Sequence, residues 1–97
     1  MKKLDEIKKK LKDHKSELKH EYNLNEIAIF GSYVHNTQTN NSDVDILVEF
    51  SHPIGLIKLI KLEEKLEKIL GVKVDVVPKK GIKIDLKDAI LKDAVAI

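Results

Sequence analysis

Apolar residues recur at helical spacing in two stretches of the chain, and each stretch predicts an amphipathic helix. The first covers residues 3–22, where lysines and acids fill the face opposite the leucines and isoleucines. The second covers residues 56–70, and Gly71 is well placed to end it as a C-cap. The residues expected on the inner sides of these helices are Leu4, Ile7, Leu11, Leu18, Leu59, Leu62, Leu66, Ile69 and Leu70.

Shorter apolar runs, rich in β-branched residues, predict three strands between and after these helices. The strands cover residues 26–30, 44–50 and 72–77. The polar stretch 33–41 has no apolar period and is expected to form a short helical turn followed by a loop. A last helix is predicted over residues 85–95, with Asp85 as its N-cap. Strands that alternate with helices predict an α/β fold, in which a sheet is layered against helices.

Length and composition narrow the class of protein. A chain of 97 residues argues for one domain, spanning residues 1–97. Apolar residues make up 42% and charged residues 35%, which is typical of a globular chain. The lack of cysteine excludes disulfides and thiolate zinc sites, and it fits a cytoplasmic location. No signal peptide is expected, and no apolar run approaches the ~20 residues that a membrane-spanning helix needs.

Charge and aromatic content disfavour a protein that reads nucleic acid directly. The net charge is only +2, all 18 basic residues are lysines, and the aromatic residues are two tyrosines and two phenylalanines. Nucleic-acid readers usually carry arginine for contacts to base edges and aromatic side chains for stacking. The lysines of residues 3–22 alternate with acids and are interpreted as a solvated helix face; a surface that attracts phosphate is the alternative.

Three aspartates lie where two of the predicted strands would bring them together. Asp43 and Asp45 stand at the start of the second strand and project to the same face, and Asp75 joins them if the third strand is a neighbour. Three carboxylates this close would repel one another unless a cation lay between them. Oxygen ligands suit Mg²⁺, or alternatively Mn²⁺, and Mg²⁺ sites commonly include substrate phosphates. The cluster therefore predicts a polyphosphate together with metal, and two ions bridged by shared carboxylates are expected.

A Gly-Ser pair ends the first predicted strand, ten residues before these aspartates. Gly31 permits a tight turn with close backbone approach, and Ser32 is expected to cap the short helix that follows. Backbone N–H groups at a helix start attract phosphate oxygens, so a phosphate is expected there if the polar loop folds back across the strand ends. Each feature alone has a plainer interpretation, such as an exposed strand end or, for Asp75, an edge charge that blocks aggregation. The hypothesis depends on their combination.

In this combination the sequence resembles the minimal nucleotidyltransferases of the DNA polymerase beta superfamily, the antitoxin halves of HEPN/MNT toxin–antitoxin pairs. Their signature is Gly-Ser followed, after ten residues, by Asp-x-Asp and later by a third carboxylate. The matching residues are Gly31, Ser32, Asp43, Asp45 and Asp75. The resemblance implies a short mixed sheet layered with helices, and a Mg²⁺-dependent enzyme that transfers AMP from ATP to a hydroxyl.

The resemblance also implies a partner and a role for each matching residue. In the antitoxins the hydroxyl belongs to a tyrosine of the HEPN ribonuclease toxin, which is thereby silenced, so a hetero-oligomer with the toxin is expected. Gly31 and Ser32 would hold the triphosphate. Asp43 and Asp45 would bind both metal ions. Asp75 would bind the catalytic ion and help to deprotonate the acceptor.

One departure from the family's pattern lies in the loop after the Gly-Ser pair. Many relatives continue Gly-Ser-x-Ala-Arg-Gly, where this chain has Val34, His35 and Asn36. Histidine is a weaker and pH-dependent substitute for arginine. His35 is therefore interpreted either as a phosphate contact or as an exposed loop residue.

Two other functions are kept as alternatives. A non-catalytic antitoxin could neutralise its toxin by binding alone. An apolar patch on the last helix would then dock the partner, unless these side chains pack in the core: Ile90, Leu91, Val95 and Ile97. Transfer of a nucleotide to a small molecule or to an RNA end is the third hypothesis, and the absence of arginine and the scarcity of aromatic residues argue against RNA.

Overall fold

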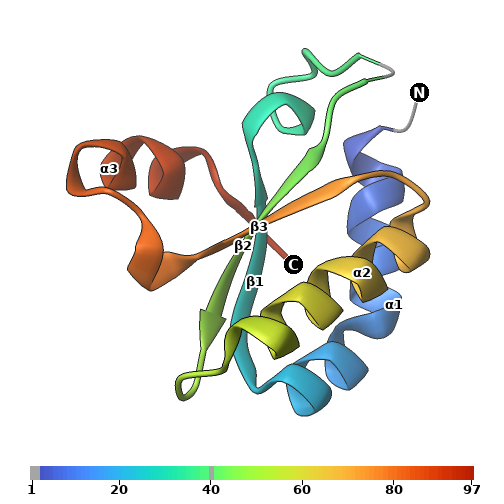
Figure 1. Ribbon diagram of the computed structural model, residues 1–97. Coiled ribbons are helices and arrows are strands. Elements are labelled where there is room, and N and C mark those ends of the chain that lie inside the picture. The colour runs from blue at the N-terminus through green and yellow to red at the C-terminus, as the bar shows by residue number, and fades with distance from the viewer. Residues whose placement is uncertain (1–2, 40) are drawn as a thin grey trace.

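Two long amphipathic helices, α1 (Leu4–Tyr22) and α2 (Leu56–Leu70), pack together on one side of a sheet (Figure 1). The computed structural model describes residues 3–39 and 41–97. Both helices match the predicted ranges closely, and their inner leucines and isoleucines carry the core. The fully buried residues of the two helices are Ile7, Leu11, Leu18, Leu62, Leu66 and Leu70. Each helix ends in a left-handed residue, Asn23 with a φ of 57° and Gly71 with a φ of 70°.

The sheet has four strands in the order β3-β2-β1-β4. They are β1 (Leu24–Phe30), β2 (Val44–Phe50), β3 (Val74–Pro78) and β4 (Val95–Ala96). β1 pairs with β2 and β4 in antiparallel fashion, whereas β2 and β3 are parallel and are joined through α2. The expected mixed sheet layered with helices is confirmed.

The end of the chain differs from the sequence prediction. The last helix, α3, spans Ile84–Asp93, and Asp85 lies inside its first turn, so the predicted N-cap is wrong; Lys83 occupies that position. The chain then leaves the helix and pairs with β1, with Ala96 opposite Ala28. A strand of two residues has no sequence period of its own and forms only because β1 offers an unpaired edge. The other boundaries move less, since β1 begins at Leu24 and β3 at Val74.

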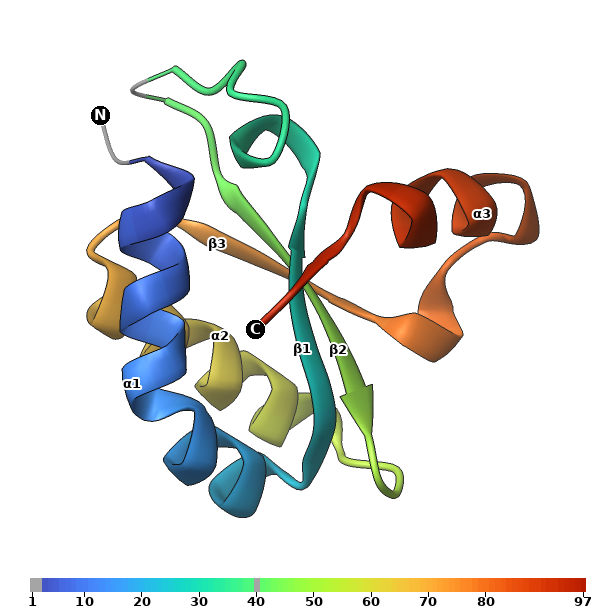
Figure 2. The same ribbon diagram turned by 180° about the vertical axis from the view of Figure 1, so that it is seen from behind.

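The two faces of the sheet have different roles. Val44, Ile46 and Val48 of β2 point into the core beneath α1 and α2. Because side chains alternate along a strand, Asp45 and Glu49 point to the opposite face, which we call the distal face. Figures 1 and 2 show α3 on this distal side, across the sheet from α1 and α2. Among the described residues no helix is both long and apolar enough to span a membrane.

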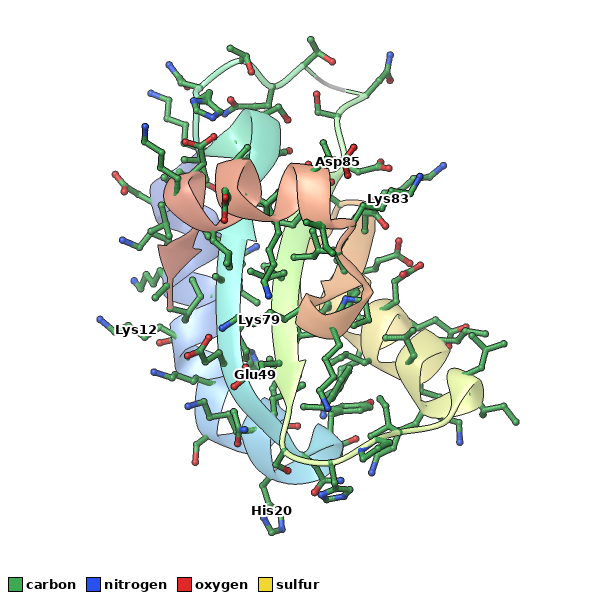
Figure 3. All side chains as sticks on the ribbon, turned by 90° about the vertical axis from the view of Figure 1, so that its left-hand side faces the viewer. Lys12, His20, Glu49, Lys79, Lys83 and Asp85 are labelled. Carbon is green, nitrogen blue, oxygen red and sulfur yellow. The ribbon has the colours of Figure 1, made fainter. Side chains whose placement is uncertain are left out.

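The distal face is polar at the end far from the start of β2. Lys79 follows β3 in the short 3₁₀ turn η2 (Lys79–Gly81), and its Nζ lies 3.5 Å from carboxylate oxygens of both Glu26 and Glu49. Figure 3 shows Lys79 and Glu49 together on this face. The cluster links the ends of three neighbouring strands. It is a structural cluster separate from the three aspartates, which lie at the other end of β2.

Lys65 joins the two long helices, and its removal tests how much this surface contact stabilises them. The Lys65 Nζ contacts Glu17 and Glu21 of α1. The Lys65 ammonium, and secondarily His14, holds the pKa of Glu17 below its usual value of 4.5. A lowered folded-state pKa stabilises the fold above the ordinary pKa, and this contribution is lost as the pH falls through the lowered value.

We expect Lys65→Met to lower the melting temperature slightly at pH ~7, with the difference from wild type shrinking below pH ~4 as Glu17 becomes protonated. Thermal denaturation at several pH values measures this. Lys68→Met is the matched control, because Lys68 lies one turn further on and forms no ion pair with any residue that the structure describes. An equal, pH-independent effect of both substitutions would contradict the prediction.

Candidate active site

Asp45 and Asp75 are direct neighbours on parallel strands. The register of β2 and β3 pairs Asp45 with Asp75, and on its other side Asp45 pairs with Phe30, the last residue of β1. Asp43 directly precedes β2, and its side chain therefore projects from the same end of the sheet. The hypothesis that the second and third strands are neighbours is confirmed, and the strand order places the three aspartates at one end of the sheet.

Gly31 packs directly against one of these carboxylates. It has a φ of +79°, a backbone conformation that L side chains rarely adopt. A Cβ atom built on Gly31 would lie 2.2 Å from Oδ2 of Asp45 and 3.1 Å from its Cγ. The glycine predicted to allow close backbone approach is thus in contact with a carboxylate, and its missing side chain makes room for Asp45.

The electrostatics of Asp45 reflect this crowding. Burial raises the pKa of the Asp45 carboxyl, and the negative charges of Asp75 and then Asp43 raise it further. Burial disfavours a charged group, and like charges nearby act in the same direction. Burial and the neighbouring negative charges both disfavour the ionised form of Asp45. A bound cation would stabilise that ionised form, so Asp45 is well suited to be a metal ligand.

The loop after β1 begins as a single 3₁₀ turn, η1 (Gly31–Tyr33), so the predicted helical turn is present but short. Phe30 is at its N-cap position and no side chain caps it, so the prediction that Ser32 would be the cap is wrong. Ser32 is the second residue of the turn and lies two positions past the N-cap. Its carbonyl instead accepts hydrogen bonds from the backbone N–H of Thr37, at 3.0 Å, and from the Thr37 hydroxyl, at 3.4 Å.

The polar loop after η1 leads back to the sheet at the start of β2, and the hypothesis that it holds a phosphate across the strand ends stays a prediction. Gln38 is buried, and Ser42 closes a turn with Thr39, whose N–H donates to the Ser42 Oγ at 2.9 Å. Asn40, also part of the predicted loop, lies outside the described residues. A hollow beside this turn is lined by Ser42, Asp43, Lys73 and their neighbours. The loop therefore ends next to the first of the aspartates.

The carboxylate oxygens of Asp43, Asp45 and Asp75 suit a hard cation, although they are not close enough together to form a complete metal site. Across residues 3–39 and 41–97, no three acidic or histidine side chains are arranged closely enough to hold a metal ion. The three aspartates nevertheless interact, because Asp43 and Asp75 both raise the pKa of Asp45. Mutual repulsion favours separation of their oxygens. Aspartate oxygens without sulfur or histidine are the ligands that Mg²⁺ and Mn²⁺ prefer.

His35 makes a contact that the sequence did not indicate. Its Nε2 lies 3.1 Å from Oδ2 of Asp93, in the last turn of α3, and both side chains are partly exposed. The loop that follows Gly31 is thereby tied to a helix from the end of the chain. The two residues are 58 positions apart, and no local pattern marks such a pair.

A mixed sheet that carries paired aspartates next to a glycine-serine turn is the arrangement expected of a nucleotidyltransferase. A family model described as "Nucleotidyltransferase domain" matches residues 4–97, and the chain belongs to this family. A protein of Methanocaldococcus jannaschii, named for protein adenylyltransferase activity, is 52% identical over 82 residues, which cover 84% of each chain.

Solved structures agree with this assignment. One described as a minimal nucleotidyltransferase superposes with a TM-score of 0.85 at 27% identity and covers 99% of this chain and 97% of that one. A toxin–antitoxin complex with AMP-PNP contains a chain with a TM-score of 0.70 at 29% identity, covering 95% of this chain and 69% of that one. The resemblance drawn from the Gly-Ser and Asp-x-Asp motifs is therefore confirmed for the family and for the fold.

Proposed function

We propose that this chain is a protein adenylyltransferase, which transfers AMP from ATP to a tyrosine hydroxyl of a HEPN-family toxin and so acts as its antitoxin. The observation that carries the proposal is the position of Asp45, which lies against Gly31 on one side and is paired with Asp75 on the other. The backbone turn that would hold the phosphates therefore lies directly against the carboxylates that would hold the metal. The name of the relative from Methanocaldococcus jannaschii and the AMP-PNP in the toxin–antitoxin structure support the same reaction.

The residues divide the reaction between them. Backbone groups of Gly31 and Ser32 orient the triphosphate, with its α-phosphorus facing Asp75. The acceptor oxygen forms a bond to the α-phosphorus while the bond from that phosphorus to the bridging oxygen of pyrophosphate breaks. The proton of the acceptor hydroxyl passes to the Asp75 carboxylate. AMP ends on the acceptor and pyrophosphate leaves.

Asp43, Asp45 and Asp75 are the residues that would hold divalent metal, with two Mg²⁺ ions as the proposed set. When bound, Mg²⁺ supplies neutralisation of the negative charge on the triphosphate and on the departing pyrophosphate. Asp45 is central in this arrangement because it is the carboxylate on which the charges of the other two converge. Its contact with Gly31 fixes the distance between the metal ligands and the phosphate-binding turn.

The experiment that tests the proposal measures the intact mass of the acceptor. A HEPN-family protein is incubated with the chain, ATP and Mg²⁺, and then analysed by mass spectrometry. We expect a mass gain in whole AMP units, which is absent with Asp43→Asn or with excess EDTA. Equal modification by wild type and Asp43→Asn would contradict the assignment of the aspartates.

A binding-only antitoxin is the second candidate. It is favoured by one observation: among the described residues the carboxylates are close but are not gathered into a ready set of metal ligands. The same experiment separates the two functions. A toxin that is neutralised with no mass gain, and equally well by Asp43→Asn, would establish occlusion in place of adenylyl transfer.

A further inference from the structure

Helix α3 carries exposed apolar side chains that the fold does not use. None of its ten residues, all of which the structure describes, is buried. Ile84 is 91% exposed, Leu86 51% and Leu91 36%. Ile84 and Leu91 share one face of the helix, and we call these two residues the α3 patch. Burying an isoleucine or leucine stabilises a protein by roughly 1.5–3 kcal/mol, so a helix that leaves three of them in water is suited to bury them against another molecule.

The α3 patch lies beside the candidate active site. Asp93, in the last turn of α3, contacts His35, four residues after Gly31 in the phosphate-binding loop. Figure 3 shows α3 crossing the distal face of the sheet close to η1, with Lys83 and Asp85 at its other end. The distal face is also the face to which Asp45 points. A molecule bound to α3 is therefore next to the aspartates.

From this position we infer that the α3 patch docks the acceptor protein and presents its hydroxyl to Asp75. The inference rests on the proposed function, and it adds the surface by which the acceptor is recognised. A macromolecular acceptor needs contacts beyond the reacting group, because a lone hydroxyl provides little binding energy and must be held in a near-attack geometry. The α3 patch offers such contacts at the side of the site.

A second exposed apolar surface provides the matched comparison. Ile57, which is 73% exposed, lies with Leu56 and Ile60 in the first turns of α2. Helix α2 begins after the far end of β2, and the five residue steps from Asp45 to Phe50, at ~3.3 Å each, place that end roughly 17 Å from Asp45. Figures 1 and 2 also place the start of α2 at the end of the sheet opposite η1. A protein docked there is poorly placed to reach the aspartates.

The charged residues of α3 point to an acceptor surface with an apolar centre. Ile84 and Leu91 are seven residues apart and share one face of the helix, with Lys87 and Asp88 between them. One positive and one negative charge on this face cancel in net charge, so neither a strongly acidic nor a strongly basic partner is favoured. The specific contact is the burial of Ile84 and Leu91 in an apolar recess of the acceptor.

The test compares Ile84→Glu with Ile57→Glu. Both replace a strongly exposed isoleucine by a charge, and neither residue belongs to the core, so both proteins are expected to fold. Three quantities are measured for each variant: the KM for the HEPN-family acceptor in AMP transfer, the Kd of its complex with that acceptor, and the Kd for AMP-PNP with Mg²⁺. For Ile84→Glu we expect the first two to rise at least about tenfold, a loss of ~1.4 kcal/mol, and the third to stay at the wild-type value. Ile57→Glu should match wild type in all three.

Other results would overturn the docking inference. Wild-type acceptor KM and Kd in Ile84→Glu would show that α3 does not contact the acceptor. A loss in Ile57→Glu alone would place the docking surface on α2. Failure of the proposed function has a different signature, since wild type would then transfer no AMP. The Kd for the acceptor complex would still report whether the α3 patch binds it, with a weaker Kd for Ile84→Glu supporting the docking surface and an unchanged Kd overturning it.

Discussion

Asp45→Asn is expected to reduce AMP transfer by at least about 10³-fold without unfolding the protein. Charge neutralisation by a bound metal is worth several kcal/mol, and each 1.36 kcal/mol corresponds to a tenfold change in rate. Asp45 is the carboxylate that contacts Gly31 and pairs with Asp75, so its neutral amide would weaken metal binding at the centre of the site. Intact-mass measurement of AMP transfer over time gives the rate.

The same variant should be at least as stable as wild type in metal-free buffer. Burial and the charges of Asp75 and Asp43 raise the pKa of Asp45. A raised carboxyl pKa means that ionised Asp45 opposes folding, and this cost is present at neutral pH and disappears as the pH falls through the raised value. Asparagine removes the charge at every pH. We therefore expect Asp45→Asn to melt at the wild-type temperature or above it near neutral pH.

Glu49→Gln is the matched control for Asp45→Asn. Glu49 is on the same face of the same strand, but its carboxylate lies near Lys79, at the opposite end from the aspartates. Its loss should leave AMP transfer close to wild type. Equal damage from both substitutions would mean that charge on the distal face in general, and not a metal ligand at Asp45, supports the reaction.

Gly31→Ala is expected to destabilise the protein by more than about 2 kcal/mol and to abolish AMP transfer. A left-handed conformation costs an L-residue roughly 1–2 kcal/mol. The new Cβ would also meet Oδ2 of Asp45 at 2.2 Å, so the carboxylate or the turn must move. For a chain of this size each kcal/mol corresponds to roughly 4–8 °C in the melting temperature. Thermal and urea denaturation measure the loss.

A double-mutant cycle separates the two causes of this loss. Asp45→Ala removes the oxygen and the carboxyl carbon that the new Cβ would meet, and leaves only the Asp45 Cβ at an ordinary 3.4 Å. In that background Gly31→Ala should cost only the backbone strain, so the two substitutions should be non-additive. Gly81→Ala is the control, because none of the described atoms lies within 4 Å of its added Cβ and its φ is not in the left-handed region. Additive effects in the cycle would contradict a direct clash with Asp45.

Local patterns in the sequence determined the elements that surround the site. The 3.6-residue period gave α1 and α2 close to their observed bounds, because an amphipathic helix must present one apolar stripe to the core. Alternation along β2 likewise placed Asp45 on the face opposite Val44 and Ile46. The Gly-Ser and Asp-x-Asp motifs, with Asp75, were sufficient to indicate a nucleotidyltransferase.

Only the tertiary structure decided which distant residues meet. The pairing of Asp45 with Asp75 depends on the parallel register of β2 and β3, and the His35–Asp93 contact joins residues 58 positions apart. Strand β4 is set by the free edge of β1, and the exposure of Ile84 by the place where α3 lies on the sheet. The hydrophobic period of a segment shows which of its side chains face the core. Strand register, edge pairing and helix docking depend instead on interaction energies between segments that are distant in the sequence. For this reason the sequence indicated the chemistry of the site, and the fold determined its geometry and the surface beside it.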